Sequence, residues 1–201
     1  MTSACAWLTW TRTGATRLSS LNLMRFAVLA RWCSDSKTHK NCNTLNKKRV
    51  ACQQARLFRW LNPVGVADFD GDGKLDVAAV VTSHIGGVLT LYHYRPPQLA
   101  PYAKAMDTSN HLMGSPEQQL AVIMQLPGLR PTIIVPDVSL KALHALRWEG
   151  NGANAKFKEL ADVKPLPARV QRISLIPDTP GTACVLLADN TWRRVTLKEG
   201  H

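Results

Sequence analysis

Nine residues between Asp68 and Asp76 carry the most specific chemical signal in this 201-residue chain. Their sequence, DFDGDGKLD, places carboxylates at positions 1, 3, 5 and 9 and a lysine at position 7. Calcium is a hard cation that takes about six to eight oxygen ligands, so alternating carboxylates on a tight loop suit it. Two glycines let the backbone turn through positive φ. The predicted calcium ligands are four carboxylates and one backbone carbonyl: Asp68, Asp70, Asp72, Asp76 and the carbonyl of Lys74.

The residues on either side of the loop decide between two kinds of calcium site. The loop begins like an EF-hand, but position 12 holds Ala79 where that motif needs a bidentate glutamate. Residues 77–81 form an apolar run rich in β-branched side chains, which favours a buried strand. Residues 63–67 contain proline and glycine, which disfavour a helix. The loop is therefore expected to join two strands. The alternative is an acidic turn without metal, although clustered carboxylates repel one another unless a cation neutralises them.

A calcium loop between two strands resembles the FG-GAP or VCBS repeat, the blade unit of integrin-like β-propellers. Residues 66–80, VADFDGDGKLDVAAV, carry this resemblance. It implies a loop that ties the first two strands of a blade together around Ca²⁺. It also implies a protein that acts by binding a protein or glycan partner. The match covers one repeat, so it predicts one metal-binding blade.

The rest of the chain repeats the predicted order of strands and turns but does not repeat the set of carboxylates. Strands, Pro/Gly turns and short polar turns succeed one another in three units, about 58–95, 110–148 and 157–198. The turns at 127–130 and 178–181 lack the ligand set, so no metal is expected there. We predict an all-β fold, a partial β-propeller of about three four-stranded blades. Propellers close with about four to eight blades, which indicates a partial or truncated member, further blades from a missing part of the chain, or another copy.

Basic residues are concentrated before the predicted repeats. Of 25 Lys and Arg residues, 11 lie in residues 1–60 beside the single acid Asp35, so this segment carries +10 of the net charge of +11. We expect residues 1–57 to be a poorly structured basic segment or a misassigned start. Its composition resembles that of a transit peptide, and it could bind nucleic acid or an anionic membrane surface. It contains no clean secretory signal, and no stretch of the chain reaches the ~20 apolar residues of a membrane span.

The calcium loop also indicates a compartment and a class of function. Calcium sites of extracellular modules are typically weak and would fill outside a cell, which favours an extracellular or periplasmic protein. We expect no enzymatic activity, because the sequence has no G-x-S-x-G, no P-loop and no histidines at metal-binding spacing. The alternative is a hydrolase or lyase on a propeller scaffold, with Asp137, His144 and Glu149 as candidate groups.

Overall fold

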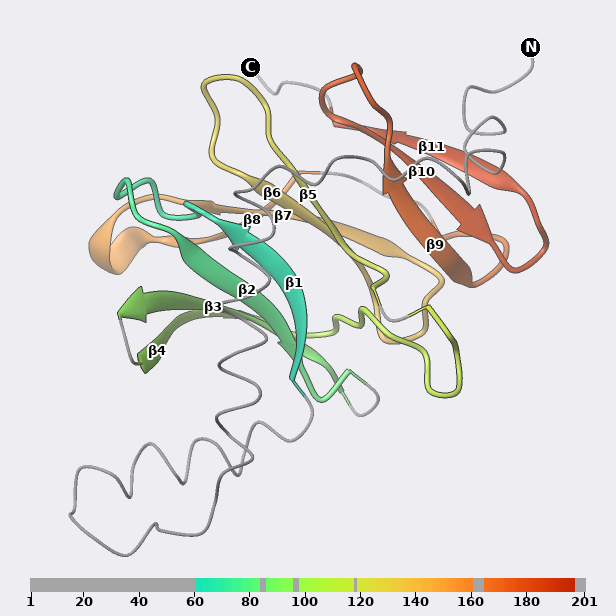
Figure 1. Ribbon diagram of the computed structural model, residues 1–201, viewed down its shortest axis with the longest axis horizontal. Helices are drawn as coiled ribbons and strands as arrows, with labels where there is room; N and C mark the ends of the chain where they lie inside the picture. The colour runs from blue at the N-terminus through green and yellow to red at the C-terminus, as the bar shows by residue number, and fades with distance from the viewer. Residues whose placement is uncertain (1–60, 84–85, 96–97, 118, 161–164, 198–201) are drawn as a thin grey trace, which may run out of the picture. The chain divides into compact units, whose positions relative to one another are not determined.

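The chain folds into antiparallel β-sheets, shown in Figure 1. The predictions made for residues 1–57 lie outside the part that the structure describes. Within that part, strands β1 to β11 form three sheets, each built from strands consecutive in sequence. The all-β prediction is therefore confirmed. The computed structural model describes residues 61–83, 86–95, 98–117, 119–160 and 165–197.

Sheet one has four strands in the order β1-β2-β3-β4. The second strand is buried along nearly its whole length, as its run of Val and Ala predicts. The fourth strand lies wholly beyond residue 95, the end of the first predicted unit. Only one of its eight residues is buried and it contains Pro101, which is tolerated on an edge strand, so its sequence gives a weak strand signal. The strands are β1 (Leu61–Ala67), β2 (Asp76–Val81), β3 (Val88–Arg95) and β4 (Gln98–Ala105).

Sheet two has four strands in the order β5-β6-β7-β8. All five residues of β6 are buried, while three of the four residues of β8 are exposed. Strand β8 begins the third predicted unit in sequence, yet it pairs with β7. The strands are β5 (Val122–Met124), β6 (Thr132–Pro136), β7 (Leu143–Glu149) and β8 (Lys156–Glu159), with a 3₁₀ turn, η2 (Gly152–Asn154), between the last two.

Sheet three has three strands among the described residues, in the order β11-β10-β9. This is one strand fewer than the four predicted for each unit. The central strand is buried along almost its whole length, and the outer strand β11 has no fully buried residue. The strands are β9 (Val170–Leu175), β10 (Thr182–Leu187) and β11 (Trp192–Thr196).

Two hydrophobic clusters pack the sheets together. Side chains on a strand alternate between the two faces of its sheet. In β6, Ile133 and Val135 accordingly join a cluster with sheet one, and Ile134 between them joins a cluster with sheet three. Sheet two is thus covered on both faces, which explains the continuous apolar run in β6.

A buried polar connector, residues 108–110, links sheets one and two. The Thr108 N–H donates to the Gly87 carbonyl at 3.1 Å, and the Ser109 N–H donates to the Pro136 carbonyl at 2.8 Å. The Asn110 side-chain amide donates to the Asn62 carbonyl at 3.2 Å and accepts from the Ser83 hydroxyl at 3.0 Å. Each of these bonds satisfies a polar group at a buried position, so the connector fixes the end of sheet one next to sheet two.

Candidate metal centre

The loop that joins β1 to β2 contains all the sequence-predicted metal ligands. Gly71 and Gly73 have φ of +77° and +81°, which confirms the conformational need for glycine at these two positions. A Cβ on Gly71 would lie 3.0 Å from Nε of Arg130, which belongs to sheet two's β5–β6 loop. The loop therefore turns tightly and also lies against a guanidinium group.

Backbone N–H groups of the loop hold its first three carboxylates. Asp68 accepts from Gly71 N at 2.7 Å through Oδ1 and from Gly73 N at 2.9 Å through Oδ2. The Asp70 Oδ1 atom accepts from Asp72 N at 3.1 Å, and Asp72 Oδ1 accepts from Lys74 N at 2.8 Å. Aspartate side chains that bond the backbone a few residues ahead stabilise such turns. The bonds also fix the direction of each carboxylate.

Three of these carboxylates are close enough to share one ion. One oxygen each from Asp68, Asp70 and Asp72 lies within 4.8 Å of the others. Calcium–oxygen distances are about 2.3–2.6 Å, so two ligands of one ion are at most ~5 Å apart. The donor chemistry and the spacing of these side chains both fit Ca²⁺.

The fourth carboxylate, Asp76, has a different environment at the first residue of β2. It is 1% exposed. Its Oδ2 accepts from the Tyr102 hydroxyl at 2.8 Å and from Phe69 N at 3.3 Å, while Oδ1 lies 3.1 Å from Nδ1 of His93. Burial raises the pKa of Asp76, and the hydrogen bonds from Tyr102 and His93 oppose that rise only in part. A cation nearby would therefore reduce the free-energy cost of burying this charged carboxylate.

Asp70 connects Asp76 to the rest of the loop. Asp70, Asp76 and His93 each offer a ligand atom within 4.8 Å of the other two, so Asp70 belongs to both groups of side chains. The structure thus brings together all four predicted carboxylates and adds His93 and Tyr102 beside them. Those two residues were missed from the sequence, because His93 faces Asp76 through the β2–β3 register and not through sequence spacing.

Tyr102 links this site to sheet two. Its ring stacks on His93 with centroids 4.0 Å apart, and its edge contacts Trp148 of β7 at 5.7 Å. Trp148 in turn makes an edge contact with Phe157 at 5.1 Å. Burial, followed by the hydrogen bond to Asp76, raises the pKa of the Tyr102 phenol, so it stays a hydrogen-bond donor. Trp148 thus packs against the rings of both Tyr102 and Phe157.

Lys74 adds two donors to the loop. Its backbone N–H and then its ammonium group, which lies 3.2 Å from Asp72 Oδ2, lower the pKa of Asp72. The Lys74 side chain is 79% exposed, so it can leave Asp72 at little cost when a metal competes. The predicted role of the Lys74 carbonyl stays a prediction.

Corresponding places in the other two sheets carry no comparable group. Within the described residues, the only clusters of three potential metal ligands are the two that include Asp70. The first residue of the second strand faces a polar residue on the third strand in every sheet: Asp76 faces His93, Thr132 faces Arg147, and Thr182 faces Thr196. The predicted absence of a carboxylate set from the turns at 127–130 and 178–181 is evident in the sequence itself.

Two of the three groups proposed for the enzyme alternative lie far apart along β7. Asp137 accepts from Lys141 N and Ala142 N in the β6–β7 turn. His144 pairs with Glu159 at 2.7 Å, and Glu149 pairs with Lys158 at 3.3 Å. His144 and Glu149 are separated by five positions of β7, or about 17 Å at the rise of a strand. These side chains do not converge on one reacting atom.

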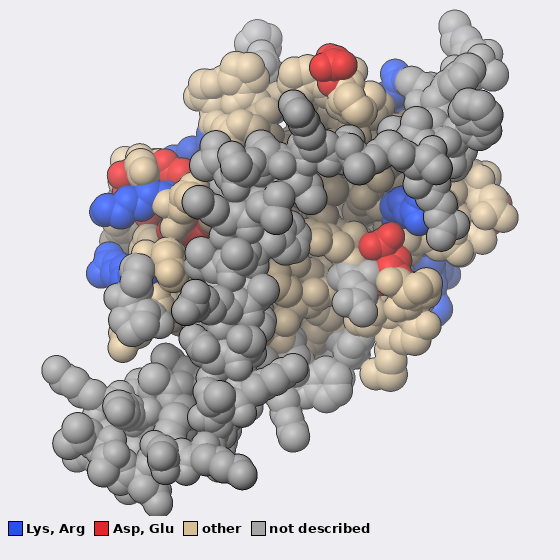
Figure 2. All heavy atoms as spheres, in the orientation of Figure 1, with Lys and Arg blue, Asp and Glu red and all other residues tan. Residues whose placement is uncertain are grey.

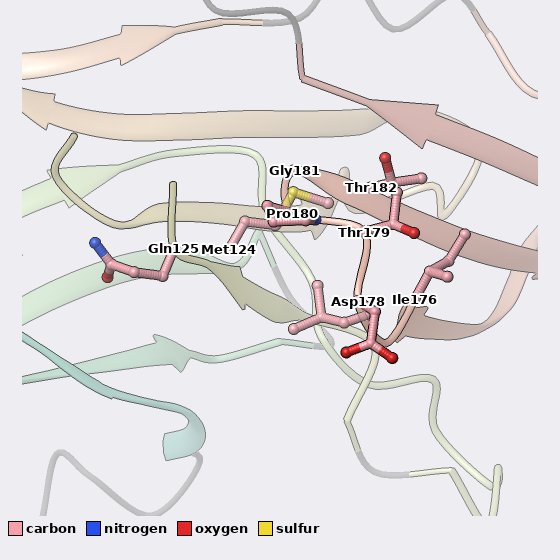
Figure 3. A pocket seen from close by; sticks show the side chains of 9 residues that line it. Met124, Gln125, Ile176, Asp178, Thr179, Pro180, Gly181 and Thr182 are labelled. Atoms are coloured by element: carbon pink, nitrogen blue, oxygen red, sulfur yellow. The ribbon is translucent and has the colours of Figure 1, made fainter. Parts of the chain in front are cut away.

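A small cavity lies at the β9–β10 turn, away from these groups. Its volume is ≈ 190 Å³, and Figure 3 shows the side chains around it. Asp178 is the only ionisable residue in its lining, so the cavity offers no acid and base pair. Its lining residues are Met124, Gln125, Leu175, Ile176, Asp178, Thr179, Pro180, Gly181 and Thr182.

Comparison of the chain with protein-family models, with curated proteins and with solved structures found no match. Among the residues that the structure describes, no helix has the length and apolar character to cross a membrane. The face visible in Figure 2 carries acidic and basic side chains side by side, and neither sign dominates it. The geometry of the β1–β2 loop is therefore the strongest indication of function among the described residues.

Proposed function

We propose that this protein is a calcium-binding module of β-propeller type, in which Ca²⁺ has a structural role. The observation that carries the proposal is the clustering of the Asp68, Asp70 and Asp72 carboxylates within 4.8 Å. Asp76 and the Lys74 carbonyl would complete the ligand set. The bound ion would supply the positive charge that balances these carboxylates, while the chain supplies their orientation through the loop N–H groups.

The arrangement of the sheets supports the propeller part of the proposal. Each sheet is an antiparallel meander, consecutive sheets share a hydrophobic cluster, and the acidic loop joins the first two strands of its sheet. These are properties of propeller blades. They agree with the FG-GAP or VCBS resemblance of residues 66–80, which remains an expectation from the sequence. On this proposal each sheet is one blade of a partial array.

A structural ion at this position indicates how the protein works and where. Calcium bound to the folded state alone would hold the β1–β2 loop in one conformation and leave the exposed loops to bind a protein or glycan. Weak calcium sites fill at extracellular calcium concentrations. We therefore propose a non-enzymatic protein that acts by binding outside the cell or in the periplasm.

The test is a calcium titration of the full chain, stripped of metal by a chelator, with thermal unfolding followed at each concentration. Binding only to the folded state adds about 2.7 kcal/mol at 100 times Kd. In a chain of this size that corresponds to a rise in Tm of about 5–10 °C. Asp70→Asn removes a charge from the site but keeps an oxygen for Asp72 N, so it should weaken calcium binding at least tenfold with little loss of metal-free stability.

Asp178→Asn is the matched control, because it neutralises an exposed aspartate in the β9–β10 turn that corresponds to the calcium loop. This variant should bind calcium like the wild type. Absence of both binding heat and a rise in Tm in the wild type would exclude the proposed function. An equal loss in both variants would show that calcium binds through general charge and not through this loop.

A further inference from the structure

His93 presents a nitrogen donor to the carboxylates of the calcium loop. Its Nδ1 lies 3.1 Å from Asp76 Oδ1 and 3.8 Å from Asp70 Oδ2. Ligands of a first-row transition ion lie about 2.0–2.2 Å from the metal, so neighbouring ligands are about 3.0–3.5 Å apart. The 3.1 Å separation matches neighbouring ligands on one small divalent ion, the 3.8 Å separation is slightly longer, and ligand atoms of Asp70, Asp76 and His93 all lie within 4.8 Å of one another.

The surrounding contacts hold this arrangement in place. Asp76 and His93 are directly opposite in the β2–β3 register, and the His93 ring is stacked on Tyr102. The Tyr102 hydroxyl and Phe69 N both bond Asp76 through Oδ2, which leaves Oδ1 facing His93. An ordered ring plane and an oriented carboxylate are the features that outer hydrogen bonds give to metal ligands.

Imidazole changes the class of ion that the site selects. Calcium is bound by oxygen, whereas imidazole nitrogen suits first-row transition ions, and carboxylates suit both groups. We propose, building on the calcium-binding function above, that His93 Nδ1 is a further ligand which makes this loop a site for first-row divalent transition ions, including Mn²⁺ in a mixed nitrogen and oxygen ligand set. Ca²⁺ uses the oxygen atoms alone, and the transition ion uses Asp70, Asp76 and His93.

One tautomer of His93 is required for binding of such an ion. Nδ1 lies at hydrogen-bond distance from Asp76. Binding through Nδ1 needs a free lone pair on that atom, so the neutral ring carries its proton on Nε2 when the ion is bound, and a proton shared between Nδ1 and Asp76 leaves through solvent. The hydrogen bond to Asp76 is then replaced by a bond from each partner to the ion, with no change in oxidation state.

Mn²⁺ is the best probe for this site in the full chain. Its paramagnetism reports directly on a bound nitrogen, and it competes poorly for the chain's five cysteines because soft thiolates favour other metals. Binding is measured by electron paramagnetic resonance of the free ion. Imidazole ligation is detected as ¹⁴N modulation of the electron spin echo. The wild type should show this modulation with Mn²⁺ bound and lose it when excess Ca²⁺ displaces the ion.

His93→Gln should abolish the ¹⁴N modulation and weaken Mn²⁺ binding by about tenfold or more, with calcium affinity within about threefold of the wild type. His144→Gln is the matched control, since His144 also pairs with a carboxylate, Glu159 at 2.7 Å, but belongs to neither ligand cluster. It should leave the modulation and both affinities unchanged.

The outcomes separate this inference from the function on which it rests. Calcium binding in a wild type that gives no ¹⁴N modulation with Mn²⁺ would overturn the role of His93 and leave the calcium proposal intact. The same holds if the modulation persists in His93→Gln. Failure of both ions to bind the wild type would remove the calcium site itself. The wild-type spectrum alone decides the first case, even if a variant fails to fold.

Discussion

Sheets one and two place polar pairs at the same position and balance charge in opposite ways. In sheet one, Asp76 faces His93 and shares its surroundings with three more carboxylates. In sheet two, the equivalent pair is Thr132 and Arg147, and Arg147 Nε donates to Thr132 Oγ1 at 3.0 Å. The cation of sheet two is covalently part of the chain. On the calcium proposal, the cation that balances the aspartates of sheet one comes from solution.

The β1–β2 and β5–β6 loops show the same contrast. The first carries aspartates, and the second carries Arg130, whose guanidinium donates to the Gly150 carbonyl at 2.9 Å and to Asn151 Oδ1 at 3.0 Å. In sheet two the positive charge of this loop is therefore bonded to oxygen atoms of the turn that follows β7. If the calcium proposal holds, the same strand arrangement is stabilised by a fixed charge in one sheet and by an exchangeable ion in the other, and only the sheet with the exchangeable ion should respond to calcium.

The largest effect on stability is expected from a substitution at the residue before the third strand of each sheet. This residue is Gly87 in sheet one and Ala142 in sheet two. A Cβ on Gly87 would lie 1.8 Å from the Thr108 carbonyl oxygen, and backbone cannot yield as a side chain can. Gly87→Ala should therefore cost more than about 4 kcal/mol in urea unfolding. Ala142→Gly should cost about 1 kcal/mol or less. A Gly87→Ala protein within 1 kcal/mol of the wild type would contradict the packing of the connector.

The second-largest effect on stability is expected from replacing Arg147, the fixed cation of sheet two. Arg147→Met leaves the buried Thr132 hydroxyl without its donor, so we expect a loss of about 1–3 kcal/mol in the free energy of unfolding. The loss should be the same with and without calcium, because Arg147 belongs to neither metal-ligand cluster. The control is Arg172→Met, an exposed arginine that should change stability by less than about 0.5 kcal/mol. A calcium-dependent loss for Arg147→Met would show that the two sheets do not balance charge independently.

A smaller effect on stability is expected from substitution of Tyr102, which tests the support of Asp76 in sheet one. Tyr102→Phe keeps the ring contacts with His93 and Trp148 but removes one of the two hydrogen bonds to Asp76 Oδ2. We expect about 1 kcal/mol of destabilisation by thermal unfolding. Tyr94→Phe, on the exposed end of β3, should have no measurable effect. Equal effects of the two substitutions would remove Tyr102 from the support of the site.

The smallest effect concerns a carboxylate of sheet two that needs no metal. Burial acts to raise the pKa of Asp137, but hydrogen bonds from Ser139, Ala142 and Lys141 prevail and hold its pKa below the usual value of 3.8. Its stabilisation is therefore present above that value and is lost as the pH falls through the lower, folded-state pKa. In acid unfolding monitored by circular dichroism, Asp137→Asn should flatten the loss of stability below about pH 4. If stability fell equally with decreasing pH in the wild type and in Asp137→Asn, this role of Asp137 would be contradicted.

Much of the fold could be predicted from side-chain pattern. The apolar runs in β2, β6 and β10 stand out because each is buried on both faces, and the glycines at 71 and 73 mark the loop. The outer strands β4 and β8 were harder to predict, since β4 has one buried residue, β8 has none, and neither has a buried run. Because β8 has no buried run that would indicate its partner, its place in the sequence does not show that it pairs with β7 in sheet two.

The candidate site was predictable only where its residues are close in sequence. The four aspartates lie within nine consecutive residues, and their spacing alone suggests a calcium site. His93 and Tyr102 reach Asp76 across two strand pairings, and the register depends on the lengths of the turns after β2 and β3, which composition does not fix. Arg147 escaped notice for the same reason, because it acts across the β6–β7 pair.

The 108–110 connector has a consequence for how the chain folds and unfolds. In repeat proteins, stability is close to a sum of terms for each repeat and for each neighbouring interface. Here the term between sheets one and two includes buried amide and hydroxyl hydrogen bonds from Ser109 and Asn110 to both sheets. Opening sheet one alone would leave those groups unsatisfied. The first two sheets should therefore act as a single cooperative folding unit, so that the unit of repetition and the unit of cooperativity differ in size.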